Sequence, residues 1–223
     1  IEYQTHGLTA ANGKRVDEQL NTFAAISDFS GIVDSLRAIK SPAELDKVRR
    51  AAELSDAALE RAMPLIKAGA DEGDILAAMH AAIFEGGGDY PANEFIIGSG
   101  PDALLCRYKA GRRKLDPQDQ LTLEWAGVFH HYHAALMRTA VIGSPTPRHL
   151  ELQAASHEAL LAVETAMKPG TSFGDVFQAH ADVMDRHNMT RHRLNACGYS
   201  LGARFTPSWM DMPMFYSGNP VTV

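Results

Sequence analysis

Two segments of this chain match each other without a gap, and this internal repeat limits the folds that the chain can adopt. Residues 55–84 align with residues 156–185 at a constant offset of 101 residues. The identical pairs include Ser55/Ser156, Ala58/Ala159, Leu59/Leu160, Lys67/Lys168, Gly69/Gly170, Gly73/Gly174, Asp74/Asp175 and Ala78/Ala179. Two amphipathic helix pairs can resemble each other by chance, but glycines that match without a gap favour a true duplication.

Each half of the repeat has the pattern of a helix, a glycine-containing turn and a second helix. We expect the second helix to begin near Asp74 or Asp175, because aspartate there accepts amide hydrogen bonds and opposes the helix dipole. Strand-like sequence follows each helix pair, at residues 93–100 and 121–143 and again at 197–205. The expected fold class is α+β, with duplicated halves and an antiparallel-rich sheet covered by helices. A ligand would lie on the open, concave face, near the pseudo-twofold axis.

The sequence before the repeat predicts further elements. Residues 5–21 have the pattern of one or two short helices, and residues 29–40 begin with strand-like character. A helix start follows at residues 41–44, with a serine that can cap, a proline at the first helical position and a glutamate that completes a capping box. We expect this helix to end near Gly69.

The composition excludes several classes of function. The chain is 45% hydrophobic and 22% charged, as in ordinary globular proteins, and its net charge of −6 without a basic run makes nucleic acid a poor partner. It has no apolar run of about 18 residues, so we expect no membrane span, and no signal peptide is visible. The two cysteines, Cys106 and Cys197, suit a reducing compartment, so we expect a cytoplasmic protein.

Polar side chains are concentrated in residues 124–139, EWAGVFHHYHAALMRT, which hold three histidines, a glutamate and an arginine. If the stretch is extended, His131 and His133 alternate along one strand and point to the same face. Histidine titrates near neutral pH, so either residue is a candidate for proton transfer. Glu124 is a candidate general base or cation anchor. A histidine triplet can also indicate metal binding.

Three segments together resemble the creatinase/aminopeptidase P/prolidase superfamily (peptidase family M24), whose catalytic domain has the pita-bread fold. They are GGDYPANEFIIGSG (87–100), EWAGVFHHYHAALMRTAVIG (124–143) and GYSLG (198–202). The Arg138-Thr139 pair and its spacing from Glu124 make the resemblance specific. The same fold is therefore expected here, with two helix-pair-plus-strand halves.

The resemblance also implies a division of the chain. Residues 1–28 resemble the tail of the family's N-terminal domain, and residues 29–223 resemble its catalytic domain. The chain starts at Ile1 without methionine and stops in a strand-like NPVTV. We therefore expect a fragment that is truncated at both ends and lacks the C-terminal part of the catalytic domain.

The metal-ligand positions of the family are altered in this chain. In the family's metallopeptidases, two aspartates, one histidine and two glutamates hold two metal ions. The aspartate positions fall at Glu124 and Ala135 and the histidine position at Tyr199, while both glutamate positions would lie beyond Val223. Alanine cannot ligate and a neutral tyrosine is a poor ligand for Mn²⁺ or Zn²⁺. We therefore expect no dinuclear Mn, Zn or Co centre.

The pattern instead resembles the metal-free branch of the superfamily, creatinase and ectoine hydrolase. The Glu-x-Ala-Gly element at 124–127, the Tyr132-His133 pair and the Gly-Tyr-x-x-Gly element at 198–202 match that branch. One position departs from it, since Arg107 stands where the branch has a histidine. Arginine cannot shuttle protons near neutral pH, but it can hold a carboxylate through two hydrogen bonds.

These observations give a set of candidate site residues. The catalytic candidates are Glu124, His133 and Tyr199, in acid–base roles and as a phenol donor to a developing oxyanion. The substrate-binding candidates are Arg107, Tyr108, His131 and Arg138. Structural alternatives are a salt bridge between Glu124 and Arg138, a surface turn at residues 107–108, and simple packing of Tyr199.

Three functions are consistent with the sequence. The first is a metal-independent hydrolase that cleaves a C–N bond in a small polar substrate of zwitterionic or amidine-like character. The second is an Xaa-Pro dipeptidase or aminopeptidase with a degenerate metal site, which would need Mn, Zn or Co. The third is a non-catalytic binding protein on a peptidase fold. The resemblance also implies a homodimer.

Overall fold

The computed structural model describes residues 1–104 and 112–223. These residues form two compact units, Ile1–Pro42 and Ala43–Val223. The smaller unit contains α1 (Ala10–Leu20) and α2 (Ile32–Ala38). The helix predicted within residues 5–21 is confirmed by α1, and the strand-like character predicted at the start of residues 29–40 is wrong.

Helix α2 forms there because Gly31 adopts a left-handed φ of 88° and starts the helix. Asp34 in the first turn and Arg37 in the last turn then complement the helix dipole. Only this local charge pattern identifies the segment as helical, and it is weaker than the apolar periodicity of the later helices.

Hydrogen bonds join residues 29–30 to the beginning of the chain. The amide of Phe29 donates to the Ile1 carbonyl at 2.8 Å, and the amide of Tyr3 donates to Ser30 Oγ at 2.9 Å. These residues therefore belong to the smaller compact unit, which extends to Pro42. That the segment is the tail of an N-terminal domain stays a prediction.

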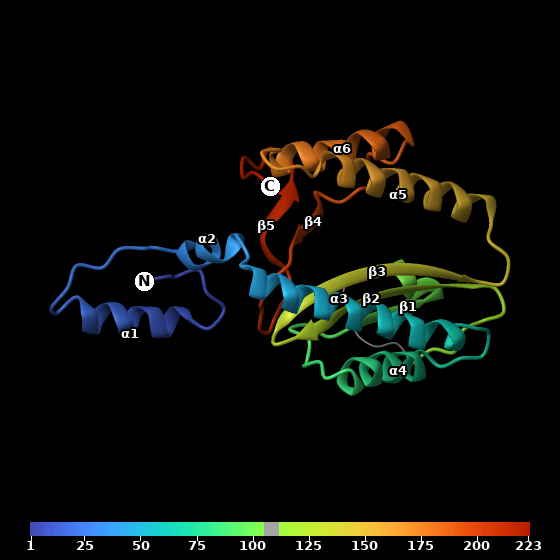
Figure 1. Cartoon of the computed structure of the whole chain (residues 1–223), viewed down its shortest axis with the longest axis horizontal. Helices are drawn as coiled ribbons and strands as arrows, with labels where there is room; N and C mark the ends of the chain where they lie inside the picture. The colour runs from blue at the N-terminus through green and yellow to red at the C-terminus, as the bar shows by residue number, and fades with distance from the viewer. Residues whose placement is uncertain (105–111) are drawn as a thin grey trace. The chain divides into compact units, whose positions relative to one another are not determined.

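The first half of the larger unit contains two long helices and a three-stranded sheet (Figure 1). Its helices are α3 (Pro42–Ala62), the short 3-10 helix η1 (Met63–Leu65) and α4 (Glu72–Glu85). Its strands are β1 (Ile96–Ser99), β2 (Asp119–Phe129) and β3 (Tyr132–Ile142), and a 3-10 helix, η2 (Gly100–Leu104), follows β1. The sheet is antiparallel in the order β1-β2-β3, so the strand pair predicted around residues 121–143 is confirmed.

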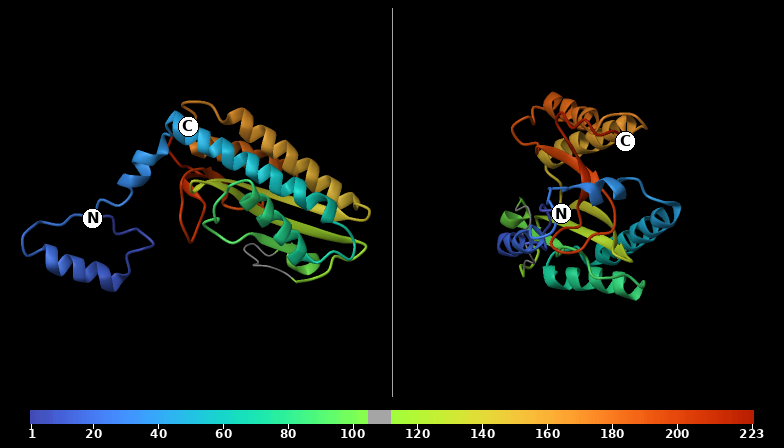
Figure 2. Two further views of the ribbon diagram at one scale, coloured as in Figure 1. Left: turned by 60° about the horizontal axis from the view of Figure 1, so that its bottom comes forward. Right: turned by 90° about the vertical axis from the view of Figure 1, so that its left-hand side faces the viewer.

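The second half repeats this plan. Helices α5 (Pro147–Ala166) and α6 (Phe173–Arg186) precede β4 (Ala196–Ser200) and β5 (Asp211–Tyr216), which pair as a two-stranded antiparallel sheet. Figure 2 shows α5 and α6 lying together next to these strands. Phe173, Val176, Phe177, Ala181 and Phe215 form the buried cluster between α6 and β5.

The structure confirms the duplication in detail. Helices α4 and α6 begin at residues 72 and 173 and end at 85 and 186, so both ends keep the offset of 101 residues. The preceding glycines, Gly69 and Gly170, adopt left-handed φ values of 83° and 88°, which favour glycine. Their amides donate to equivalent carbonyls, those of Leu115 at 2.7 Å and Val223 at 3.0 Å.

The two faces of the three-stranded sheet differ, because successive residues of a strand point to opposite sides. On one face the indole Nε1 of Trp125 donates to the Ser55 carbonyl of α3 at 3.0 Å. On the same face, a Cβ at Gly127 would lie 1.9 Å from the Ala51 carbonyl oxygen. Helix α3 therefore covers this face, and its backbone contacts the backbone of β2. Glu124 points to the other face.

A buried carboxylate fixes α4 against β1. Glu72, in the first turn of α4, is 1% exposed. It accepts hydrogen bonds from Ser99 Oγ at 2.5 Å and from the Arg113 amide at 3.0 Å. The guanidinium of Arg113 in turn contacts Asp119 at the start of β2. The free edge of β1 is therefore held at a fixed distance from α4.

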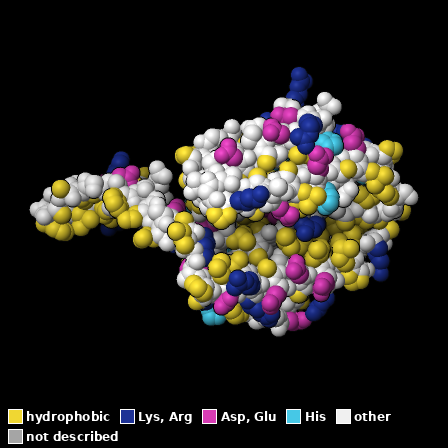
Figure 3. All heavy atoms as spheres, turned by 45° about the horizontal axis from the view of Figure 1, so that its top comes forward, with side chains coloured by type: hydrophobic (Ala, Val, Ile, Leu, Met, Phe, Trp, Pro, Cys, Tyr) yellow, Lys and Arg dark blue, Asp and Glu magenta, His cyan; other side chains and the backbone are white. Residues whose placement is uncertain are grey.

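Charges of both signs are interspersed on the face shown in Figure 3, and apolar side chains line a hollow band between them. On that face there is no single-sign patch of the kind that nucleic acid requires. Among the described residues, no helix is both long enough and apolar enough to cross a membrane.

Replacing Gly127 with alanine should destabilise the larger unit by at least ~2 kcal/mol, because the new methyl group would overlap the backbone of α3. Chemical denaturation measures this change in the free energy of unfolding. Gly7→Ala is the control, because no atom lies within 4 Å of the added Cβ. A Gly127→Ala protein as stable as the control would contradict the close contact between α3 and β2.

Candidate functional site

The hairpin between β2 and β3 turns at His130 and His131, which have φ values of 49° and 63°. The expectation that His131 continues the strand and shares a face with His133 is therefore wrong. The amide of His131 donates to Asp89 Oδ2 at 3.2 Å, and its exposed ring lies 4.5 Å from that of Phe205. His131 belongs to the exposed end of the hairpin.

Glu124 lies on the face of the sheet that α3 does not cover. Its direct partners across the sheet are Ile96 of β1 and Met137 of β3. The register also pairs Ala126 with Ala135 and Val128 with His133. Glu124, His133 and Ala135 consequently point to the same face, as the strand alternation requires. The Glu124 carboxylate is half-buried there.

Ala135 lies diagonally across from Glu124, two residue pairs along the hairpin. A carboxylate at this position would project from the same face within reach of Glu124. The alanine methyl group offers no lone pair to a metal ion. That Ala135 stands at a metal-ligand position stays a prediction.

Tyr199 stands at the position that the resemblance assigns to the histidine ligand. It lies on β4 and packs against the main core. Its phenol oxygen accepts a hydrogen bond from Nε1 of Trp209 at 3.0 Å, and Trp209 is 2% exposed. Within residues 1–104 and 112–223, no three His, Cys, Asp or Glu side chains are grouped so that they could hold a metal ion. The described residues do not fit the dinuclear centre of the metallopeptidases.

His133 is completely buried. Its Nε2 accepts a hydrogen bond from the Ala92 amide at 2.9 Å, which places the hydrogen of the neutral ring on Nδ1. Its own amide donates to the Gly202 carbonyl at 3.2 Å. Burial lowers the pKa of His133 to about 4, although the carbonyls of His131 and Gly202 oppose the shift. The ring is neutral at pH 7 and joins three segments of the chain.

Of the remaining candidates, Arg138 is described by the structure and is not brought together with Glu124. Arg138 pairs with Leu123, so it starts from the opposite face of the sheet, and its exposed guanidinium donates to the Met137 carbonyl at 2.8 Å. Arg107 and Tyr108 lie outside the described residues. The roles assigned to these three residues stay predictions.

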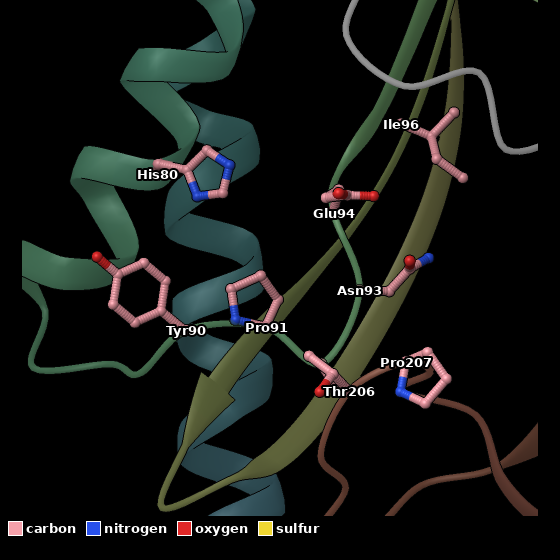
Figure 4. A pocket seen from close by; sticks show the side chains of 9 residues that line it. His80, Tyr90, Pro91, Asn93, Glu94, Ile96, Thr206 and Pro207 are labelled. Carbon is pink, nitrogen blue, oxygen red and sulfur yellow. The ribbon is translucent and has the colours of Figure 1, made fainter. Parts of the chain in front are cut away.

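A pocket of about 590 Å³ lies at the free edge of β1 (Figure 4). Its wall consists of His80 from α4, residues 90–94 and Ile96 from the segment that enters β1, and residues 206–207 from the loop after β4. The ring of His80 stacks on Phe95 with centroids 4.1 Å apart, and burial lowers its pKa. No local motif in the sequence marks His80 as part of a site.

Two of the three catalytic candidates contact the wall of the pocket. Ile96 is the strand partner of Glu124, and Ala92 donates its amide hydrogen bond to His133. The buried histidine therefore fixes the backbone of the pocket wall instead of facing the pocket itself.

Acid should destabilise the protein through His133. Below about pH 6.5 the unfolded chain binds a proton at this residue, while the folded protein does not until about pH 4. The contribution of neutral His133 to the free energy of unfolding is therefore complete at neutral pH. It is lost as the pH falls through this window, by up to roughly 3 kcal/mol. His133→Gln keeps an acceptor for Ala92 without titrating, so its unfolding free energy should fall less between pH 7 and pH 4.5.

The exposed His192→Gln variant serves as the matched control and should retain the wild-type pH slope. Other histidines with lowered pKa values, such as His80 and His180, are present in all three proteins and cancel. Identical slopes for His133→Gln and wild type would contradict the buried neutral state.

Comparison with known proteins identifies the family to which this chain belongs. Residues 46–221 match metallopeptidase family M24. The chain is 27% identical to an ectoine hydrolase of Halomonas elongata over 200 residues, 86% of this chain and 50% of that protein. It is 23% identical to an Xaa-Pro dipeptidase of Pyrococcus furiosus over 202 residues, 89% of this chain and 58% of that protein. The chain thus spans about half the length of these curated relatives.

Among solved structures, the prolidase from Pyrococcus furiosus is similar with a TM-score of 0.89 at 20% identity, covering 100% of this chain and 64% of that chain. This likeness confirms the pita-bread fold predicted for the chain. The family match extends over most of the residues, from the first turns of α3 to the end of the second half. The chain therefore belongs to metallopeptidase family M24.

Proposed function

We propose that this protein is a hydrolase that cleaves a C–N bond in a small polar substrate without a dinuclear metal centre. The observation that carries the proposal is the diagonal placement of Ala135 relative to Glu124, on the face of the sheet that α3 does not cover. One carboxylate is retained there, and a methyl group stands where the second ligand would be. A general base needs one such carboxylate, whereas a dinuclear site needs several.

Glu124 acts as the base in this proposal. It takes a proton from the attacking water, whose oxygen forms a bond to the carbon of the C–N group. The same proton passes to the leaving nitrogen as the C–N bond breaks, which returns Glu124 to its starting state. Tyr199 is the donor that stabilises the charge developing on the heteroatom of the substrate.

The environment of Tyr199 supports this role. Its oxygen accepts the Trp209 indole hydrogen bond, which fixes the position of the phenol. A phenol can both accept a hydrogen bond at its oxygen and donate one through its O–H. His133 is a positioning residue in this scheme, because a buried neutral ring cannot reach substrate.

The names of two relatives suggest two kinds of substrate for this protein. One is named ectoine hydrolase and another Xaa-Pro dipeptidase. The altered metal positions favour the first kind of substrate, a small zwitterionic or amidine-like molecule. The Xaa-Pro peptidase and the non-catalytic binding protein are the competing functions, and a homodimer is the expected assembly.

Glu124→Gln should lower kcat on such a substrate by about 10²–10⁴-fold, because the amide cannot accept the proton from water. Activity is measured on ectoine, creatine and Xaa-Pro dipeptides, with and without EDTA. Glu164→Gln, which removes an exposed charge from α5, is the control and should keep wild-type activity. Two Mn, Zn or Co ions per subunit with activity abolished by EDTA would establish the peptidase instead. No turnover on any of the three substrate types would favour a binding protein.

Restoring the ligand types should create metal affinity. The double variant Ala135→Asp, Tyr199→His places a carboxylate beside Glu124 and an imidazole at the third position, and these are ligands for Mn²⁺ and Zn²⁺. Calorimetric titration with Mn²⁺ should show at least about tenfold tighter binding than wild type. The variant Ala135→Asn, Tyr199→His adds a side chain of the same size without charge and should gain much less. Equal affinity in wild type and the double variant would contradict the assignment of these positions.

A further inference from the structure

The surroundings of Glu124 are closed on two sides. Its direct partner on β1, Ile96, is only 5% exposed. Along β2 toward the hairpin turn, the next residue on the same face is Ala126, which is completely buried. Ala135, the partner of Ala126 on β3, is partly buried and packs against the main core. A ligand therefore does not reach Glu124 from the β1 side or from the turn.

The exposed residues of this face lie on β3. Met137 is the direct partner of Glu124 across the strand pair, and it is 54% exposed. Thr139, the next residue of β3 on the same face, is also exposed. Among the described residues of the three strands, Met137 is the one large apolar side chain that is exposed. The approach to Glu124 therefore passes over Met137.

A single exposed apolar residue is normal on a protein surface, so the exposure of Met137 alone would mean little. Its position beside the proposed base is what gives it significance. Directly opposite residues of an antiparallel pair have Cβ atoms about 4.5–5.5 Å apart. The attacked carbon must lie about 3–3.5 Å from the water that Glu124 activates. A substrate that enters from the open side and reaches this water must also contact the Met137 side chain.

We propose that Met137 is a substrate-contact residue that determines specificity, because its thioether side chain packs against the carbon atoms next to the C–N group. Methionine suits such a role, since its flexible, polarisable side chain adapts to irregular apolar shapes. The inference rests on the proposed function, because it concerns the face on which Glu124 acts.

Methyl NMR of the full chain tests the contact directly. The protein is labelled with ¹³C in the methionine methyl groups, and Met137→Leu identifies the Met137 signal by its loss. Ectoine, creatine and the dipeptide Gly-Pro are the probes. At least one of them should shift the Met137 signal to saturation. Met63 is the internal control, because it is equally exposed at 56% but lies in η1, at the end of the helix that covers the opposite face.

The Met63 signal should stay in place. A Met137 signal that none of the three probes moves, or equal shifts of the Met137 and Met63 signals, would overturn the proposal.

Variants of Met137 test whether the contact contributes to affinity. Met137→Ala should weaken binding of the probe that shifts the signal by about fivefold to tenfold, because the apolar contact is lost. Met137→Leu conserves the volume and should stay within about twofold of wild type. Met63→Ala should bind as wild type does. Affinities are measured by calorimetric titration, and circular dichroism checks folding. Unchanged affinity in a folded Met137→Ala protein would overturn the proposal.

Turnover then separates this inference from the proposed function. For a substrate that is hydrolysed, Met137→Ala should raise KM and leave kcat unchanged, since the contact is present before and during the reaction. A probe that binds through Met137 but is not hydrolysed, in a protein that cleaves no C–N substrate, would contradict the proposed function and leave the Met137 contact intact. Hydrolysis with the same KM in wild type and Met137→Ala would overturn the role of Met137 alone.

Discussion

The contact between α3 and β2 determines which face of the sheet is available for a site. At Gly127 the two backbones approach so closely that even one methyl group would overlap the Ala51 carbonyl, and beside it Trp125 hydrogen-bonds to Ser55. Since α3 seals this face, strand alternation directs Glu124 and Ala135 to the other face. A shift of one residue in the strand register would bury Glu124 under the helix. The contact between α3 and β2 therefore also fixes the face to which Glu124 points.

His133 connects that face to the pocket at the edge of β1. The ring accepts from Ala92 in the pocket wall, and the amide donates to Gly202 in the segment that follows β4. A buried imidazole contributes to this arrangement only while it is neutral. Burial keeps the ring of His133 neutral, so its Nε2 can accept the Ala92 hydrogen bond and hold the pocket wall in place.

Much of the fold followed from the sequence because its signals are local or periodic. The ungapped glycines, Gly69 and Gly170, predicted the duplication, and both adopt the left-handed φ that such a match implies. The strand-like sequence at residues 121–143 predicted the strand pair, and the structure then placed Ala135 diagonally across from Glu124. The turn at His130 and His131 was not predicted, because two histidines with positive φ are an unusual choice for a tight turn. That error placed His131 on the wrong element.

The sequence by itself determined which side chains stand at two positions that the resemblance assigns to metal ligands: an alanine, which offers no lone pair, and a tyrosine, which is a poor ligand when it is neutral. It also determined the repeat and the family. Only the tertiary structure decided that His133 is buried and neutral, and that His80, Glu94 and residues 206–207 line one pocket. Burial and proximity arise from the packing of segments far apart in the chain, and no local pattern of residues records which segments will meet.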